Sequence, residues 1–225
     1  MPQTDSRAIT ATKKKYAEYF FPAAVAVLVI FHAVGLWGLA FSGNAAYFQS
    51  LTPLNLLLTN AILFSLHKQW NLSFIVFAIV TAVTGFMAEV VGVHTALLFG
   101  YYTYGEALGT KLWEVPLLIG LNWLMLVYTT GHISNYTRWH WLAKCILGAA
   151  LMVLLDYFIE PVAVKFDFWS WTNNQIPVTN FTGWFGIAFL LQICFQKANF
   201  QKGNKIAPVV FFIQAFFFIS LFMLL

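Results

Sequence analysis

Charged residues are scarce in this chain of 225 residues. Only 9% are Asp, Glu, Lys or Arg, whereas 60% are apolar. A soluble domain carries about 25% charged residues, so this chain lacks the polar surface that would face water. The net charge of +4 comes from basic residues at the N-terminus and in short loops, where they report membrane orientation. It therefore does not indicate a nucleic-acid partner.

Cysteine and the common ligand motifs are also scarce. The two cysteines, Cys145 and Cys194, lie in apolar stretches, where a free thiol packs as a small hydrophobic group. The sequence has no HExxH motif, P-loop or His-Cys cluster, all of which would indicate metal or nucleotide binding. Asp156-x-x-x-Glu160 could bind Mg²⁺ with a diphosphate, but the paired aspartate-rich motifs of a membrane prenyltransferase are missing. We therefore predict no metal site.

Long apolar stretches fill most of the chain. A helix that crosses the hydrocarbon core needs about 20 mostly apolar residues. Stretches that meet or approach this length lie at about 19–41, 52–66, 72–91, 113–131, 141–160, 180–197 and 206–225. We predict an all-α, polytopic membrane bundle of about seven transmembrane helices. Residues 1–18 would form a cytoplasmic N-terminal tail, and residues 19–225 a single transmembrane domain.

Lys and Arg divide unequally between the two sides of this predicted bundle. Of the 12 in the chain, only Lys111 and Lys165 fall on one side, and the other ten fall on the opposite side. Cytoplasmic loops are enriched in Lys and Arg. The count predicts an odd number of helices with the N-terminus inside and the C-terminus outside. We expect the bacterial inner membrane as the location.

Three carboxylates lie in or near apolar spans towards the outer side: Glu89, Asp156 and Glu160. The i, i+4 spacing of Asp156 and Glu160 places both on one helix face. Carboxylates in a membrane are costly unless they are paired or face a cavity, so they are candidates for function. Two plainer interpretations stay open: an interfacial anchor that reaches water, and a hydrogen bond between helices.

Two outer loops, 92–112 and 161–179, are rich in Tyr, Trp, Asn, Thr and Gly. Such loops can fold back over a bundle where they line a cavity. The candidate substrate-binding residues in and next to these loops are His94, Tyr101, Tyr102, Tyr104, Trp169, Trp171, Asn180 and Trp184. The aromatic residues also fit an interfacial belt, and a lone histidine such as His94 is more often a hydrogen-bonded loop residue. A cavity whose ring faces stabilise a cation is the sharper hypothesis.

Seven short motifs occur in a fixed order between about residues 80 and 190. They are Ala88-Glu89-Val90-Val91-Gly92-Val93-His94-Thr95, Phe99-Gly100-Tyr101-Tyr102-Thr103-Tyr104, Leu108-Gly109, Val115-Pro116, Asp156-x-x-x-Glu160-Pro161, Phe168-Trp169-Ser170-Trp171 and Pro177-x-x-Asn180-Phe181-x-Gly183-Trp184. Together they resemble the carotenoid 1′,2′-hydratase family, which includes the bisanhydrobacterioruberin hydratases. The chain departs from the family where Ala96 replaces a frequent glycine and where Glu160 replaces a frequent aspartate.

The resemblance implies addition of water across the terminal C1′=C2′ bond of an acyclic carotenoid end, as in lycopene or γ-carotene. The substrate would enter from the bilayer, and the reaction needs no redox cofactor. An alkene is a weak base, and a carboxylic acid in an apolar site can stay protonated near neutral pH and protonate it. Asp156 or Glu89 is the candidate acid, and Glu160 the candidate base for water. Other membrane enzymes of carotenoid synthesis are candidate partners.

Three other functions fit parts of this pattern. A small membrane-type lycopene cyclase would share the first protonation but capture the cation with an internal double bond. A proton-coupled transporter also carries intramembrane carboxylates, although the chain shows no repeated pair of broken helices. A retinal protein is excluded because the last span, 206–225, contains no lysine for a Schiff base.

Overall fold

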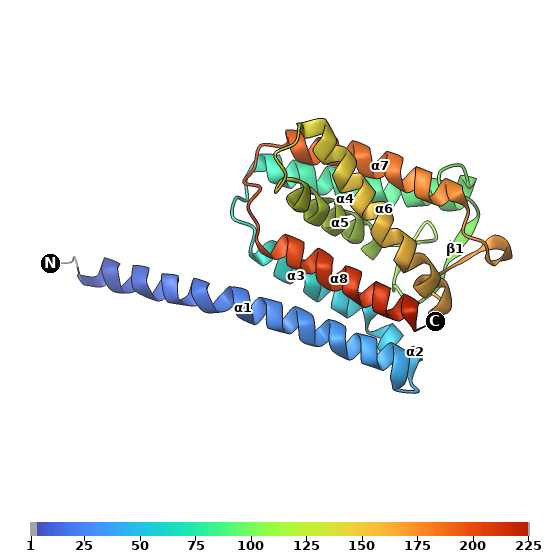
Figure 1. Cartoon of the computed structure of the whole chain (residues 1–225), viewed down its shortest axis with the longest axis horizontal. Helices are drawn as coiled ribbons and strands as arrows, with labels where there is room; N and C mark the ends of the chain where they lie inside the picture. Colours follow the sequence, from blue (N-terminus) through green and yellow to red (C-terminus); the bar gives the residue numbers. More distant parts are fainter. Residues whose placement is uncertain (1–3, 225) are drawn as a thin grey trace.

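The computed structural model describes residues 4–224, and it describes side chains from Tyr19 onward. The chain forms a bundle of long helices with two small two-stranded sheets at one end (Figure 1). The helices are α1 (Thr4–Phe41), α2 (Ala45–Ser50), α3 (Thr52–Ser65), α4 (Leu72–Thr95), α5 (Leu118–Ser134), α6 (Trp141–Lys165), α7 (Val178–Lys197) and α8 (Ile206–Met223). The strands are β1 (Tyr102–Tyr104), β2 (Lys111–Leu112), β3 (Val115–Pro116) and β4 (Trp169–Trp171), and a 3₁₀ turn covers Thr172–Asn174.

A helix lies at each of the seven predicted places, and the prediction of an all-α membrane bundle is confirmed. Five of these helices are long and apolar enough to cross a membrane: Tyr19–Phe41 of α1, α4, α6, α7 and α8. The other two, α3 and α5, have 14 and 17 residues. The count of seven membrane spans stays a prediction.

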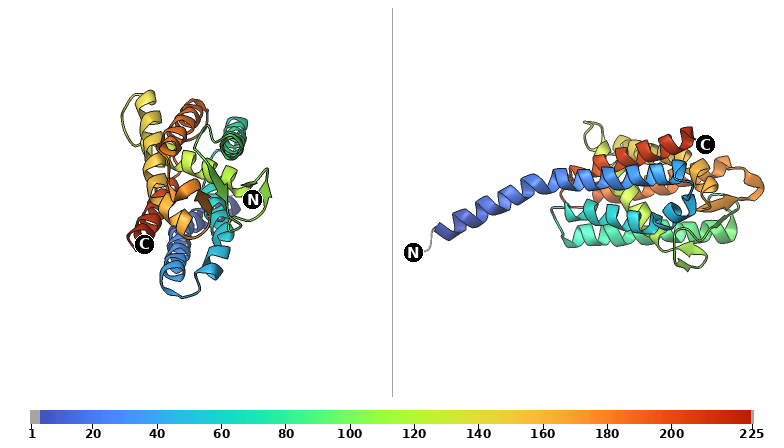
Figure 2. Two further views of the ribbon diagram at one scale, coloured as in Figure 1. Left: turned by 90° about the vertical axis from the view of Figure 1, so that its right-hand side faces the viewer. Right: turned by 90° about the horizontal axis from the view of Figure 1, so that it is seen from below.

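Helix α1 is the longest element and lies at the edge of the bundle. Its 38 residues correspond to about 57 Å at a rise of 1.5 Å per residue. Its C-terminal half lies beside α8 and α3, and its N-terminal half extends beyond the other helices (Figures 1 and 2). Residues 4–18 of the predicted cytoplasmic tail thus continue this helix, and residues 1–3 lie outside the described part.

The loop between α6 and α7 is shorter than the sequence predicts, and the loop between α4 and α5 is shifted along the chain without becoming shorter. α4 continues to Thr95 instead of ending near 91, and α6 continues through Pro161 to Lys165. A proline removes only one backbone donor, and membrane helices tolerate this loss. Conversely, α5 starts at Leu118 rather than at 113, because β2 and β3 form a hairpin there. Its two turn residues, Trp113 and Glu114, have positive φ values of 51° and 66°.

The loop between α4 and α5 and the loop between α6 and α7 pair with each other. Strands β1 and β4 are antiparallel, with Tyr102 opposite Trp171 and Tyr104 opposite Trp169. Successive side chains of a strand point to opposite faces. These four aromatic residues therefore share one face, while Thr103 and Ser170 share the other and approach within 3.1 Å through their hydroxyl oxygens. The paired strands cover the end of the bundle opposite the N-terminus of α1 (Figure 1).

Short loops tie the other end of the bundle together. Asn71, after α3, donates a 2.8 Å hydrogen bond to the Asn199 carbonyl, after α7. The Asn199 N–H in turn donates to the Ser73 hydroxyl, and the Gln201 N–H donates to the Gln69 side chain. These contacts fix the spacing of α4 and α7, which carry part of the site at the far end.

Candidate functional site

Glu89 is the first of three buried carboxyl groups at the end of the bundle beneath β1 and β4. It lies near the C-terminal end of α4, and only 3% of the residue is exposed. Its Oε2 accepts hydrogen bonds from Tyr102 Oη at 2.6 Å and Tyr104 Oη at 2.8 Å. Its Oε1 accepts one from Trp123 Nε1 of α5 at 3.1 Å. Both oxygens of Glu89 therefore have donors.

The two tyrosines are held as hydrogen-bond donors. Burial, reinforced by the nearby charge of Glu89, raises the pKa of Tyr102 and of Tyr104 well above the ordinary value for a phenol. Both hydroxyls therefore keep their protons at physiological pH. Their i, i+2 spacing in β1 directs both towards Glu89.

Asp156 and Glu160 lie one helical turn apart on α6, and both are almost fully buried. Glu160 Oε2 accepts hydrogen bonds from Trp169 Nε1 at 2.9 Å and Trp171 Nε1 at 2.7 Å. Asn180, in the first turn of α7, donates through Nδ2 to both carboxyl groups. Its distances are 3.0 Å to Glu160 Oε1 and 2.9 Å to Asp156 Oδ2.

One carboxyl oxygen differs from the other five. Asp156 Oδ1 is buried and has no hydrogen-bond partner in the described part of the chain. A buried polar atom without a partner costs about 1–3 kcal/mol and calls for an explanation. Two arrangements would satisfy this oxygen: a proton bound to it, or a reacting group placed against it.

The three carboxyl groups surround one small cavity, which we call the carboxylate cavity. Its volume is about 30 Å³, and its wall also contains Trp123 and Trp184. The two indole rings stack with centroids 4.2 Å apart and planes inclined by 20°. A cavity needs about 10–15 Å³ of space open to the centre of a water-sized sphere to hold one water. The carboxylate cavity therefore has room for a water beside the carboxyl groups.

Most of the predicted site residues meet at this cavity. Glu89, Asp156, Glu160, Tyr102, Tyr104, Trp169, Trp171, Asn180 and Trp184 all line it. His94 and Tyr101 do not. His94 lies in the last turn of α4, with its Nδ1 3.8 Å from Glu114 Oε2, and the side chain of Tyr101 is exposed. Tyr101 directly precedes β1, and its side chain does not line the cavity.

Four residues of the cavity wall were not predicted from the sequence. Ile119, Asn122 and Trp123 of α5 and Ile159 of α6 also line the carboxylate cavity. The pair Asn122-Trp123 in an otherwise apolar span was a usable signal, because a buried indole N–H generally needs an acceptor. The two isoleucines gave no signal in the sequence. An apolar side chain in an apolar span can equally line a cavity or pack against a neighbouring helix.

The fold and the site define an all-α membrane protein with a cluster of buried carboxyl groups beneath an aromatic cover. The chain belongs to the family of carotenoid biosynthesis proteins, whose family model matches residues 51–225. The resemblance predicted from the sequence motifs is thereby confirmed, and a role in carotenoid biosynthesis follows.

A curated relative carries a more specific name. Bisanhydrobacterioruberin hydratase of Haloarcula japonica is 26% identical over 137 residues, which cover 53% of this chain and 45% of the relative. The match thus spans less than half the length of that protein. No solved structure matches this chain.

Proposed function

We propose that this protein is a hydratase that adds water across the terminal C1′=C2′ bond of an acyclic carotenoid end, as in lycopene or γ-carotene. The product would carry a tertiary hydroxyl at C1′. The observation that supports this most directly is the carboxylate cavity, where Asp156 Oδ1 lacks a partner in a space of about 30 Å³. The hydratase relative and the family membership agree with it.

Asp156 is the acid in this proposal. Glu160 Oε2 accepts two indole N–H groups and its Oε1 accepts Asn180, while Glu89 accepts three donors. Indole and amide N–H groups only donate, and donors favour the charged form of the carboxyl group that they face. Glu89 and Glu160 each face three donors and Asp156 faces one, so Asp156 holds the proton at rest. Asp156 Oδ1 faces no such donor. Its O–H adds the proton to C2′ and leaves a tertiary cation at C1′.

Aromatic and anionic groups stabilise that cation. The stacked rings of Trp123 and Trp184 line the cavity, and an indole face attracts a cation by about 2 kcal/mol or more when water is excluded. Glu89 and Glu160 place negative charge around the same space without reorganisation, which is the arrangement that stabilises charge most effectively.

Capture of the cation by water completes the reaction. Glu160 accepts one proton of the water as its oxygen bonds to C1′. Asp156 then recovers a proton from Glu160, one turn away on α6, so that acid and base return to their starting states. Asn180, which contacts both carboxyl groups, holds them in position for this exchange.

Expression of the chain in a lycopene-accumulating bacterium tests the function. We expect a new pigment heavier than lycopene by the mass of one water, or of two where both ends react. A lycopene cyclase would instead give a product of unchanged mass. Unchanged lycopene in cells with abundant, folded protein would contradict both reactions and favour a proton-coupled carrier.

The proposal extends to membrane orientation. We propose seven spans with the N-terminus in the cytoplasm, in an inner membrane, because ten of the 12 Lys and Arg residues follow this arrangement. The carboxylate cavity then lies near the outer surface. Other carotenoid-pathway enzymes in the same membrane are proposed partners, since substrate and product both stay in the bilayer.

Gly92 positions Tyr102 against Glu89, and its replacement gives a further prediction. A Cβ on Gly92 would lie 2.8 Å from Tyr102 Oη and 2.5 Å from Phe99 Cδ2. We expect Gly92→Ala to displace Tyr102 and lower hydration by about tenfold or more, since small misplacements cost up to about a hundredfold. Gly186→Ala is the control, because a Cβ on Gly186 in α7 meets nothing within 4 Å. Equal product yields from the two variants, at equal protein levels, would contradict this role.

A further inference from the structure

A second, larger cavity adjoins the carboxylate cavity. Its volume is about 220 Å³, and it lies between α1, α3, α5 and α8. The two cavities share four wall residues: Ile119, Asn122, Ile159 and Trp169. A group placed against the carboxyl groups is therefore next to this apolar cavity, which we call the chain cavity.

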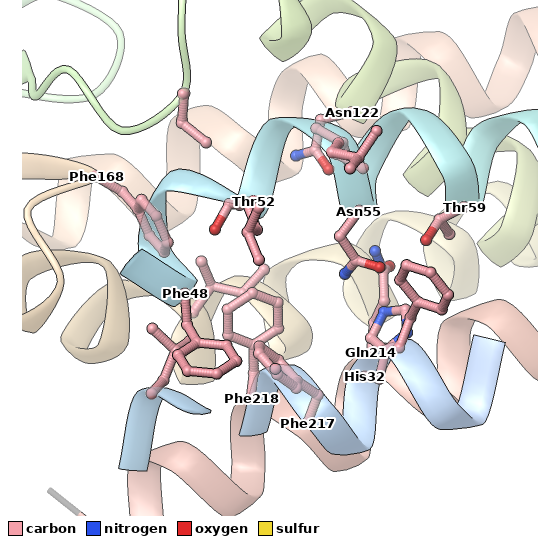
Figure 3. Close-up of a pocket in the computed structure, with 18 of the residues that line it drawn as sticks. His32, Phe48, Thr52, Asn55, Thr59, Asn122, Phe168, Gln214, Phe217 and Phe218 are labelled. Carbon is pink, nitrogen blue, oxygen red and sulfur yellow. The ribbon is translucent and has the colours of Figure 1, made fainter. Parts of the chain in front are cut away.

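The chain cavity has an aromatic side and a polar side. Figure 3 shows Phe48 and Phe168 on one side and His32, Asn55, Thr59 and Gln214 grouped on the other. The aromatic side is the one next to the carboxyl groups, because Phe168 precedes Trp169 in the chain. Along α3, Thr52 and Thr59 are separated by about 10 Å of helix rise, so the polar side lies deeper in the bundle.

The polar side disfavours hydrocarbon. The side-chain oxygens of Asn55 and Gln214 are buried and have no hydrogen-bond partner in the described part of the chain. A hydrocarbon chain packed against them would offer no donor and would keep them from water. An apolar ligand that starts at the carboxyl groups is therefore not directed towards the inner end of the bundle.

The chain cavity reaches the surface of the bundle between α1 and α3. The cavity wall includes Phe31 and Val34 of α1, Leu54 of α3, and Leu51, which directly precedes α3. All four side chains are exposed. Exposed apolar residues on a membrane protein face hydrocarbon. The chain cavity thus opens to the bilayer core rather than to water.

Helix α1 forms one wall of the chain cavity and is held to the other helices by apolar packing. Over Tyr19–Phe41 its described side chains form no hydrogen bond with another helix, since His32 contacts the Leu28 carbonyl of α1 itself. It also precedes the residues that the family model matches. A helix held by apolar packing alone can shift outward without breaking a polar contact.

We propose that the gap between α1 and α3 is a lateral portal for the polyene arm of the substrate. The end group occupies the carboxylate cavity, the adjoining segment occupies the chain cavity, and the rest of the arm stays in the lipid. A cavity of about 220 Å³ then suffices for a carotenoid, because it holds only part of the molecule. This inference rests on the proposed function for the identity of the occupant.

Bulky substitutions at the portal test the proposal by activity. Val34→Trp and Leu54→Trp place an indole at the mouth, and we expect carotenoid conversion to fall by about tenfold or more, because the end group can no longer reach its position. The matched controls are Val29→Trp and Leu57→Trp. Val29 and Leu57 are 48% and 47% exposed on the same two helices, close to 51% for Val34 and 59% for Leu54, but line no part of the cavity. Wild-type conversion by both portal variants would overturn the proposal.

A labelling experiment separates failure of the portal from failure of the proposed function. Cys194 is exposed and Cys145 is buried, so Cys194→Ala gives a background of low reactivity. In it, Val34→Cys and Leu54→Cys are purified in detergent and treated with a maleimide at about pH 8.5, where water reaches the thiols and they can ionise, with and without lycopene. We expect lycopene to slow labelling at these positions and not at Val29→Cys or Leu57→Cys. Protection without hydration would retain the portal and reject the hydratase; hydration without protection would do the reverse.

Discussion

Asp156→Asn is expected to lower hydration by about a thousandfold, within the range of about 10²–10⁴ that general acid catalysis contributes. The substitution keeps the size of the side chain and removes its transferable proton. It also removes the one carboxyl oxygen without a partner, Oδ1. Product per unit of folded protein, measured by mass spectrometry of extracted pigments, gives the result.

Glu106→Gln is the matched control for Asp156→Asn. Glu106 also lies in the loop that carries β1, but its side chain is exposed and pairs with Lys111 Nζ at 2.7 Å. We expect wild-type yield from this variant. If Asp156→Asn also retains wild-type yield, the proton comes from another group, and Glu89→Gln becomes the decisive variant.

Glu160→Gln is expected to impair both activity and stability. Glu160 accepts three N–H donors, and an amide in its place turns at least one of its own N–H groups towards them. A buried donor left without an acceptor costs about 1–3 kcal/mol, which a lower melting temperature in detergent would report. Loss of the base should lower hydration by a further factor of about 10²–10⁴.

Trp169→Phe separates the two roles of Glu160. It removes one donor to Glu160 and leaves the carboxylate in place, so we expect a modest loss of stability with most of the activity retained. If Glu160→Gln lowers the melting temperature but its folded fraction turns over at the wild-type rate, then Glu160 has only a structural role.

The helices and the carboxyl groups were predictable because each has a local signal. Apolar stretches marked the places of α1 and of α3 to α8, and carboxylates in an apolar setting marked Glu89, Asp156 and Glu160. The i, i+4 spacing also placed the last two on one face. These signals depend only on neighbours in the sequence.

The contacts between loops were not predictable in the same way. Nothing local shows that Tyr102 lies opposite Trp171, or that Trp123 of α5 reaches Glu89 of α4. Helix ends were also misplaced, since a hairpin replaced the expected first turn of α5 and α6 continued past Pro161. Pairing across 67 positions, as between Thr103 and Ser170, is a property of the assembled bundle.

The pairing of β1 with β4 makes the four aromatic donors of the site a single unit for evolution and for engineering. A slip of one residue in the register would turn both tyrosines or both tryptophans to the outer face. Glu89 or Glu160 would then lose two of its donors at once. An insertion or deletion in these loops therefore preserves the site only if it keeps the register of β1 and β4. We expect homologues whose loops differ in length to carry the insertions or deletions outside the two strands.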